Sequence, residues 1–576
     1  MTIVAGPELR RRALVYGFVA AIGALAVGFM IRLELPLHYP YANDTAGYVE
    51  EATNLLAGNG LQRSTYKYGA VPALASQPFF PPGFSIAIAS LGALGIAPKA
   101  ASLAISWASW ALLTAAILFA LRPLLPGILI PSAIGVTTVT SPGLYEWGFQ
   151  GLSDAPALLL SVLSIGGLLR GIRQEPGSYR WALVSGLAAG LAYTVRNAAL
   201  ILPATAIAVF TVAVAWRALP TRAVFQRAVA WSFGFAALLL PLLVRNMLVF
   251  GKVQPYFAHV GQSHYGWVKA IRVVLWSSLF DLSGSKTVAA IAWSFQLLAA
   301  IGIPIAAATL WLVRRYWKHA LPEARLKAFA LFAFICLGLA MIAIGRVRFD
   351  WVETTLTRYV MQYSWALLGV IAMLVASGAT PPRSRALARG ALVFLCALLT
   401  VVHGWFIRND LLREAKIARS LSSQPDFVAA AESLEEPKWI LTNQLRRSIA
   451  QDSGLKAYVA DMPDQVELIS NFGPTLYLET GRPFRDVQAS RDQLKRVGQE
   501  AAQSDYGRAV VAVVGIFLPT NGILRGHEAG NWQNAILKDL GPGFSRCGTH
   551  PNVLIVVRPV QPEQGVDFQC GTYQVS

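Results

Sequence analysis

The stretch ALVYGFVAAIGALAVGFMIRLELPLHYPYANDTAGYVEEATNLLAGNGL, residues 13–61, decides the fold class of this chain. Its first part, residues 13–31, is an apolar run about long enough to span a bilayer. Three arginines at 10–12 precede this run, and a sequence that resembles a signal-cleavage site falls inside it. We therefore expect an uncleaved span that starts in the cytoplasm. The polar part that follows, residues 38–61, then faces outward.

The composition of the whole chain is that of a membrane protein. Of its 576 residues, 55% are hydrophobic and 14% are charged, and the mean hydropathy is +0.48. Soluble domains carry about 25% charged residues. The net charge of +18 lies in short basic clusters between apolar runs. This is the positive-inside pattern of membrane proteins, and it argues against nucleic acid as a partner.

Apolar runs along the chain predict about eleven membrane-spanning helices. They lie at 13–32, 100–121, 127–142, 153–170, 181–195, 198–216, 229–247, 287–313, 328–345, 359–377 and 388–406. The basic loops alternate with loops that are longer or richer in acidic, aromatic and amide residues. Placing the basic set in the cytoplasm puts the other set outside. The outer set is 33–99, 143–152, 248–286 and 346–358, together with everything after about residue 407.

The first outer loop, residues 33–99, is expected to contain two helices that lie on the membrane surface. One runs from about Thr45 to Ala57 and ends at Gly58. The other is the apolar segment at 81–96, which opens with Pro-Pro and is too short for a span.

The chain after about residue 410 changes character. Short β-branched runs alternate there with helical patterns, which predicts a small α/β domain. We therefore expect a transmembrane domain over 1–409 and an extracytoplasmic domain over 410–576. Cys547 and Cys570 are predicted to form a disulfide, because such a compartment is oxidising. The alternative is two unpaired thiols.

Acidic residues lie at the predicted outer ends of the spans. Asp44 begins the helix after the first span, and Asp154 opens a later span. Both could simply cap these helices, which is the structural alternative. Glu146 has no such explanation. Glu50 and Glu51, farther along the helix of Asp44, are expected to be solvated.

Positive charge on the outer side also needs an explanation. The arginines at or near this face are Arg196, Arg245, Arg346, Arg348 and Arg358. An anionic ligand is one explanation. Anionic lipid headgroups, or pairing with Asp350 and Glu353, are the alternatives.

The order of these segments resembles the GT-C glycosyltransferases, polytopic enzymes that transfer a sugar from a polyprenyl-phosphate carrier at the outer face. Protein O-mannosyltransferases and the aminoarabinose transferase of lipid A show the most similar pattern. The resemblance covers roughly residues 10–365. It rests on NDTAGYVEEATNLLAGNGL, QPFFPPGFSIAIASLGALG, GLSDAPALLL, AGLAYTVRNAALILPA, RNMLVFG and TRYVMQYSWALL.

The resemblance implies roles for individual residues. The acidic residue of the first outer loop, here Asp44, corresponds to the proposed catalytic base, and Asp154 corresponds to the second acidic position. Family members hold the carrier phosphate with basic residues and a tyrosine. The candidates here are Arg245, Arg358, Lys67, Tyr68 and Arg196. The other residues expected in the cavity are Glu146, Asn246, Tyr256 and His264.

The expected function is transfer of a sugar from a polyprenyl-phosphate donor to an acceptor hydroxyl at the outer face of a bacterial inner membrane. The expected partners are this donor, membrane lipids and an envelope glycan, lipid or protein as acceptor. No cofactor is assigned, no metal ligands are assigned, and a divalent metal stays open. A transporter or flippase of lipid-linked glycans is the alternative, although paired repeats are absent from the sequence. A scaffold for envelope machinery is a third reading.

Overall fold

The structure, a computed structural model of the chain, describes 7–64, 74–76, 80–125, 127–175, 177–255, 266–290, 294, 314, 322–348, 356–376, 382–423, 446–464, 466–486, 491–501, 510–515, 532–541, 544–550 and 553–558. The chain forms two compact units. The first contains 1–31, 78–84 and 103–408, and the second contains 32–77, 85–102 and 409–576. Most of residues 33–99, the predicted first outer loop, therefore belongs to the same unit as the end of the chain.

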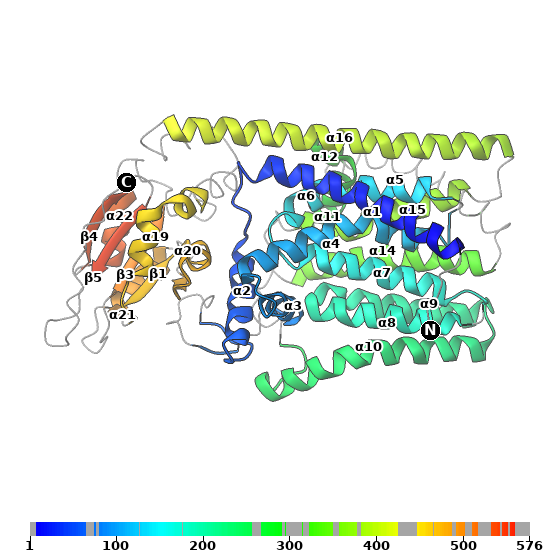
Figure 1. Cartoon of the computed structure of the whole chain (residues 1–576), viewed down its shortest axis with the longest axis horizontal. Helices are drawn as coiled ribbons and strands as arrows, with labels where there is room; N and C mark the ends of the chain where they lie inside the picture. Colours follow the sequence, from blue (N-terminus) through cyan, green and yellow to red (C-terminus); the bar gives the residue numbers. More distant parts are fainter. Residues whose placement is uncertain are drawn as a thin grey trace. The chain divides into compact units, whose positions relative to one another are not determined.

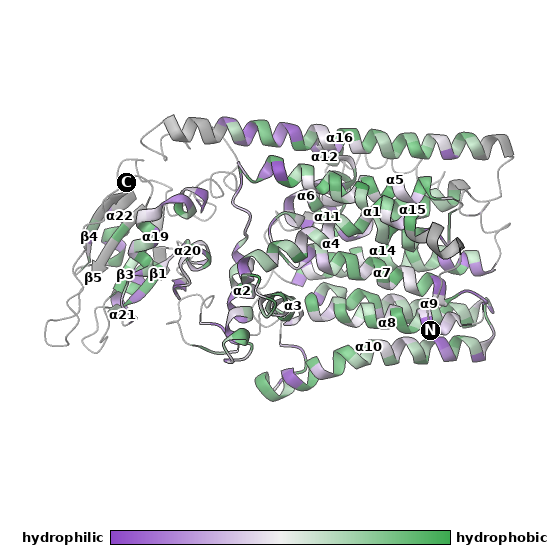
Figure 2. Cartoon of the chain, in the orientation of Figure 1, coloured by the Kyte–Doolittle hydropathy of each residue, from purple (hydrophilic) through white to green (hydrophobic). Residues whose placement is uncertain are grey.

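The first unit is a bundle of helices (Figure 1). Its helices are α1 (Pro7–Glu34), α4 (Pro98–Leu121), α5 (Leu129–Val139), α6 (Pro142–Gly148), α7 (Asp154–Gly171), α8 (Ser178–Val195), η1 (Asn197–Leu200), α9 (Ile201–Ala215), α10 (Thr221–Phe250), α11 (Trp267–Ser283), α12 (Lys286–Ala290), α14 (Pro322–Arg348), α15 (Leu356–Ala376) and α16 (Pro382–Ser423). Hydrophobic residues predominate along these helices (Figure 2).

Seven described helices are long and apolar enough to cross a membrane, judged by length and composition. They are Leu14–Glu34, Pro98–Leu121, Asp154–Gly171, Asn197–Ala215, Thr221–Phe250, Pro322–Arg348 and Ala386–Lys416. Each coincides with a predicted span. The predictions at 127–142, 181–195 and 359–377 coincide with helices α5, α8 and α15. The predicted span 287–313 lies almost entirely outside the described residues.

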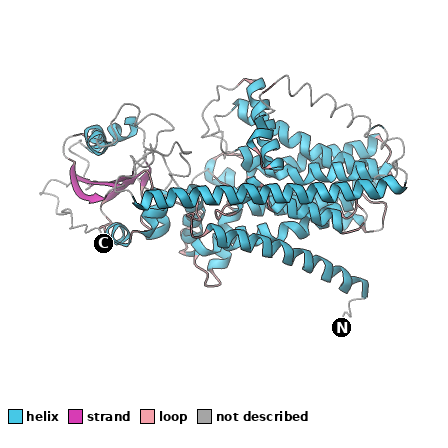
Figure 3. Cartoon of the chain, turned by 90° about the horizontal axis from the view of Figure 1, so that it is seen from above, coloured by secondary structure: helices cyan, strands magenta, loops and turns pink. Residues whose placement is uncertain are grey.

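Two segments differ from the sequence prediction. The loop predicted over 248–286 contains helix α11, which packs against α14 and α15. The prediction missed this helix because Lys269 and Arg272 interrupt its apolar residues. The span at 388–406 and the charged segment after it form one continuous helix, α16, of 42 residues (Figure 3). At 1.5 Å per residue this helix is about 63 Å long, about twice the thickness of a bilayer core.

Glycines allow α8 and α10 to approach each other closely. A Cβ atom at Gly186 would lie 2.0 Å from the carbonyl oxygen of Trp231, and one at Gly234 would lie 2.5 Å from that of Leu183. Small residues at helix contacts are the usual means of close packing in a membrane, where no hydrophobic effect drives helices together. Helix α8 also packs along α7.

The second unit combines α2 (Asn43–Leu56) and most of α3 (Gly83–Gly92) with the folded end of the chain. The later helices are α19 (Ser453–Ala460), α20 (Gly473–Thr480), α21 (Arg491–Ala501) and α22 (Trp532–Leu540). The strands are β1 (Glu467–Ser470), β2 (Arg485–Asp486), β3 (Val510–Gly515), β4 (Ser545–His550) and β5 (Val553–Arg558). They lie together in one sheet (Figure 3). The order of the strands is β2-β1-β3-β5-β4. Strand β1 is parallel to β2 and β3, and β5 is antiparallel to β3 and β4.

The described cysteines fall into two kinds. Cys336 and Cys396 are free, and Cys547 on β4 is disulfide-bonded. Cys570, the predicted partner of Cys547, lies outside the described residues, so the pairing stays a prediction.

Candidate functional site

Three helix ends of the first unit bring charged residues together. Asp154 is the first residue of α7, and Arg196 directly follows α8 as its C-cap residue. Because α7 and α8 are antiparallel neighbours, the start of one lies beside the end of the other. Arg358 lies in the first turn of α15 and reaches the same point. We call Asp154, Arg196 and Arg358 the arginine–aspartate cluster.

The carboxylate of Asp154 pairs with both guanidinium groups. Its Oδ1 accepts a hydrogen bond from Arg358 Nε at 2.8 Å, and its Oδ2 lies 2.7 Å from Arg358 Nη2. Arg196 Nη1 lies 2.8 Å from the same Oδ2. The pairing with Arg358 is thus bidentate, the geometry that fixes a guanidinium most firmly. Asp154 is 0% exposed, and the arginines are 9% and 8% exposed.

The cluster holds two guanidinium groups, which are donors for an anion. Two guanidiniums meet one carboxylate, and an arginine has five N–H donors. Among the described atoms, Arg196 Nε is buried without a hydrogen-bond partner. A buried polar group of this kind needs an explanation, such as an oxygen that the ligand supplies.

Aromatic rings complete the surroundings of the two arginines. The guanidinium carbon of Arg358 lies 5.0 Å from the ring centre of Trp147 on α6, and that of Arg196 lies 5.1 Å from that of Tyr359. Such stacking holds a guanidinium while leaving its edges able to donate. The cluster can therefore bind a phosphate group in a site that is largely shielded from water.

The alternative that Asp154 is the N-cap of α7 is wrong. The N-cap residue of α7 is Ser153, and the carboxylate of Asp154 is directed to the two arginines. The same holds for the first surface helix. The N-cap of α2 is Ala42, and Thr45 Oγ1 accepts the hydrogen bond from its backbone N–H at 3.1 Å. Asp44 lies in the first turn of α2, half-buried, and is not the cap.

Other predicted cavity residues have different surroundings. Arg245 near the end of α10 lies over the ring of Phe250 and donates to Asn246 Oδ1 at 3.5 Å. Asn246 is 0% exposed, and its Nδ2 donates to the carbonyl of Val253 at 3.1 Å, which ties down the chain after α10. These contacts of Arg245 are not shared with the arginine–aspartate cluster.

The remaining predicted residues divide into two sets. Glu146 lies on α6, half-buried, next to Trp147. Lys67, Tyr68, Tyr256 and His264 lie outside the described residues. In the part of the chain that the structure describes, no group of three or more His, Cys, Asp or Glu residues is arranged to hold a metal ion.

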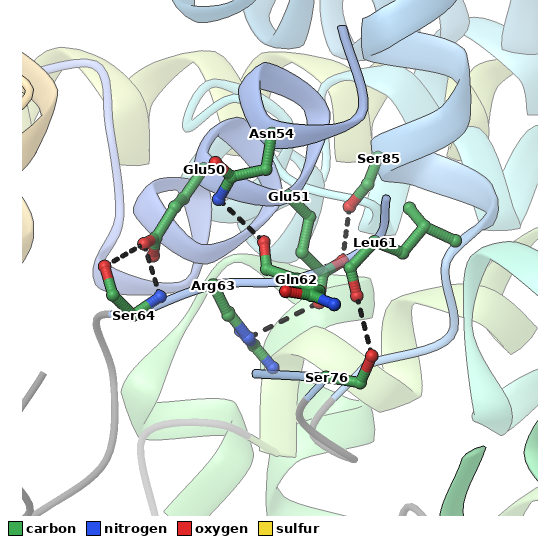
Figure 4. Close-up of polar contacts among 9 residues, drawn as sticks. All are labelled: Glu50, Glu51, Asn54, Leu61, Gln62, Arg63, Ser64, Ser76 and Ser85. Carbon is green, nitrogen blue, oxygen red and sulfur yellow. Dashed lines mark hydrogen bonds and ion pairs between the residues drawn. The ribbon is translucent and has the colours of Figure 1, made fainter. Parts of the chain in front are cut away.

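The expectation that Glu50 and Glu51 are solvated is wrong. They are 2% and 3% exposed, because α2 is covered on several sides and every residue from Thr45 to Ala52 is buried. Figure 4 shows the contacts of the two carboxylates. Glu50 Oε1 accepts from the backbone N–H of Ser64 at 2.6 Å and from its hydroxyl at 2.8 Å.

The carboxylate of Glu51 joins two further segments to α2. Its Oε2 accepts from Ser85 Oγ on α3 at 2.8 Å, and its Oε1 lies 3.4 Å from Nε of Arg63 (Figure 4). Arg63 is 0% exposed and forms a bridge to Ala75 through the backbone. Glu50 and Glu51 therefore hold the first outer loop together.

Replacing Glu51 by Ala is expected to lower the free energy of unfolding by about 3–5 kcal/mol, because it removes one partner of a buried ion pair. The measurement is the midpoint of thermal unfolding of the purified protein. Glu175→Ala is the matched control, since Glu175 pairs with Arg173 on the surface, with side chains 58% and 40% exposed. A surface pair contributes about 0–1 kcal/mol. Equal midpoints for the two variants would contradict the prediction.

The structure also reveals a buried carboxylate that the sequence analysis missed. Asp281, near the end of α11, is 0% exposed. It accepts from the backbone N–H of Gly143 at 2.9 Å and from the hydroxyl of Ser364. It thus ties α6, which carries Trp147, to α15, which carries Arg358. Its only sequence signal is one charge in the apolar segment LWSSLFDLS.

Comparison with known proteins places this geometry in context. No protein family model and no curated protein matches the sequence. Among solved structures, the fold is similar to ArnT from Cupriavidus metallidurans bound to undecaprenyl phosphate, with 13% identity, a TM-score of 0.54, and coverage of 95% of this chain and 98% of that chain. The apo form of ArnT gives 12% identity, the same coverage and a TM-score of 0.55.

A third similar structure is that of the arabinofuranosyltransferase AftD from Mycobacteria. The identity is 15%, the TM-score is 0.50, and the match covers 94% of this chain and 41% of that chain. ArnT and AftD are both GT-C superfamily glycosyltransferases that use polyprenyl-phosphate-linked donors. At these identities, the similarity establishes the fold.

Proposed function

We propose that this chain, which has the GT-C glycosyltransferase fold, transfers a sugar from a polyprenyl-phosphate carrier to an acceptor hydroxyl at the outer face of a bacterial inner membrane. The observation that supports this most is the arginine–aspartate cluster. It is buried, it brings two guanidiniums to one carboxylate, and Arg196 Nε is a buried donor that no described atom satisfies. These are the properties that a lipid phosphate requires of its site.

The proposed chemistry uses these guanidiniums at the leaving group. As the acceptor oxygen bonds to the anomeric carbon, the bond from that carbon to the carrier oxygen breaks, and negative charge grows on the carrier phosphate. Arg196 and Arg358, already fixed by Asp154, stabilise that charge without having to reorganise. Because Asp154 is occupied by two guanidiniums, we assign it the role of holding them.

Asp44 is the proposed base. The acceptor hydroxyl must lose its proton as it attacks, and a carboxylate within hydrogen-bond reach can take it. Asp44 is neither the cap of α2 nor one of the two carboxylates that hold the loop together. No nucleotide is needed, because the sugar is already activated by its link to the phosphate.

The direct test is an activity assay. Purified protein in nanodiscs is incubated with a set of polyprenyl-phosphate sugars and an extract of envelope glycans, lipids and proteins, and the released polyprenyl phosphate is measured. We expect release with at least one donor, dependent on the acceptor extract. A flippase would move the labelled donor between leaflets and release no polyprenyl phosphate, and that result would overturn the proposal.

The chain after α16 is expected to lie outside the cytoplasm. The basic loop at 170–180 is held inside by its charges, whereas the end of the chain lies on the opposite side in the predicted topology. Alkaline phosphatase fused after residue 423 should therefore be active, because the enzyme needs an oxidising compartment. The same enzyme fused after residue 175 should be inactive.

The paired fusions control for expression, since they differ only in the point of attachment. The reverse pattern, with activity after residue 175 and none after residue 423, would contradict both the topology and the outer-face location of Asp44.

A further inference from the structure

The folded end of the chain packs directly against the helix that carries Asp44. Both belong to the second unit, and the contact is made by α20 on α2. Tyr477 of α20 lies close to Glu50 and Thr53 of α2. Burial, followed by the charge of Glu50, raises the pKa of Tyr477 well above its ordinary value. The contact between α2 and α20 is therefore closely packed and shielded from solvent.

One carboxylate of α20 makes two further contacts with the first outer loop. Glu479 Oε1 accepts a hydrogen bond from Tyr39 Oη at 2.8 Å and from Lys99 Nζ at 2.5 Å. The side chains of Glu479 and Lys99 are 13% and 31% exposed. The Lys99 ammonium also lies 4.9 Å from the ring centre of Tyr41, which packs edge-on against Tyr39.

These contacts join positions that are far apart in the loop. Tyr39 and Tyr41 precede α2, whereas Lys99 lies in the first turn of α4, after α3. Glu479 thus contacts residues near both ends of the first outer loop. Burial, followed by the charge of Glu479, raises the pKa of Tyr39, so the phenol stays a donor over the working pH range. The proposed chemistry makes no use of this arrangement.

We propose that Glu479 is a positioning residue, through which the folded end of the chain fixes the segment before α2 and with it Asp44. This inference rests on the proposed role of Asp44 as the base. The segment from Tyr39 to Tyr41 leads into the first turn of α2, where Asp44 lies. A misplacement of about 1 Å at a reacting group can reduce the rate about 100-fold. Releasing Tyr39 and Lys99 therefore reduces turnover even though no reacting group is removed.

The test compares Glu479→Ala with Asp464→Ala in the full-length protein. Asp464 is the matched control, because it belongs to the same folded region and pairs with Arg482, yet its side chain is 99% exposed. We expect faster hydrogen exchange at the start of α2 in Glu479→Ala alone. We also expect its kcat to fall about 10-fold or more, with unchanged affinity for undecaprenyl phosphate.

A charge reversal separates positioning from general damage. In the variant Glu479→Lys, hydrogen exchange at the start of α2 should be faster than in the wild type. Adding Lys99→Glu should restore most of the protection against exchange and most of kcat. Unchanged exchange at α2 in Glu479→Ala would overturn the inference, as would a double variant without recovery. A parallel loss of carrier affinity and kcat would also overturn it, because that pattern indicates loss of the whole fold.

Hydrogen exchange also keeps this inference separate from the proposed function. If the wild-type protein transfers no sugar, the proposed function fails, and the exchange at α2 still decides whether Glu479 fixes that helix. If transfer occurs and Glu479→Ala changes neither exchange nor kcat, only the positioning role fails.

Discussion

Replacing Asp44 by Asn is expected to reduce turnover about 100-fold or more while leaving the fold intact. The change removes a proton acceptor and keeps the size of the side chain. The fold should survive because the N-cap of α2 is Ala42, and the carboxylates that hold the loop together are Glu50 and Glu51. The measurement is kcat for release of polyprenyl phosphate, together with the midpoint of thermal unfolding.

The neighbouring residue provides a stringent control. Asn43 is exposed and begins α2. The double variant Asn43→Asp/Asp44→Asn has the composition of the wild type, but its carboxylate is moved by one residue, about 100° around the helix. It should remain as slow as the single variant. Near-normal turnover in a well-folded Asp44→Asn protein would remove Asp44 as the base and leave Glu146 and Asp154 as candidates.

Arg358→Ala and Arg196→Ala are each expected to weaken the binding of undecaprenyl phosphate. A hydrogen bond to a charged group contributes about 1.5–3 kcal/mol, which corresponds to about 10- to 150-fold in affinity. The loss should be larger for Arg358, because its bidentate pairing with Asp154 also fixes the carboxylate that holds Arg196. The measurement is the dissociation constant of the carrier in nanodiscs.

Conservative variants distinguish geometry from charge. Arg358→Lys keeps the charge and loses the planar two-point contact, so it should recover only part of the affinity. Arg245→Ala, measured in parallel, tests the predicted phosphate ligand that lies outside the arginine–aspartate cluster. Unchanged affinity in both Arg196→Ala and Arg358→Ala would show that other basic groups hold the phosphate.

Much of the helical fold follows from hydropathy. All predicted spans except 287–313, which lies almost entirely outside the described residues, coincide with described helices. A run of apolar residues long enough for a bilayer can satisfy its backbone there only as a helix. Helix α11 escaped prediction because Lys269 and Arg272 break its apolar pattern. The continuity of α16 was not predicted, because the change from apolar to charged residues within it was interpreted as the end of the helix. Hydropathy reports the environment, and it does not report where a helix ends.

The candidate site was predictable residue by residue, but its pairings were not. Positive charges on the predicted outer side and acidic residues at predicted span ends made Asp154, Arg196 and Arg358 candidates. That they contact one another follows from the packing of α7, α8 and α15, which no local pattern encodes. The same limit explains the error for Glu50 and Glu51. Their burial depends on Arg63, Ser64 and Ser85, which meet them only in the folded loop.

The central claim is that the arginine–aspartate cluster binds the carrier phosphate. A structure of the protein with undecaprenyl phosphate tests this claim most directly, because binding of the carrier requires neither the sugar nor the acceptor. The arginine–aspartate cluster should hold the lipid phosphate, with one oxygen within hydrogen-bond distance of Arg196 Nε and another within reach of Arg358. Asp154 should keep its pairing with both arginines. A phosphate bound elsewhere, for example at Arg245, with Arg196 Nε still lacking a partner, would contradict the account.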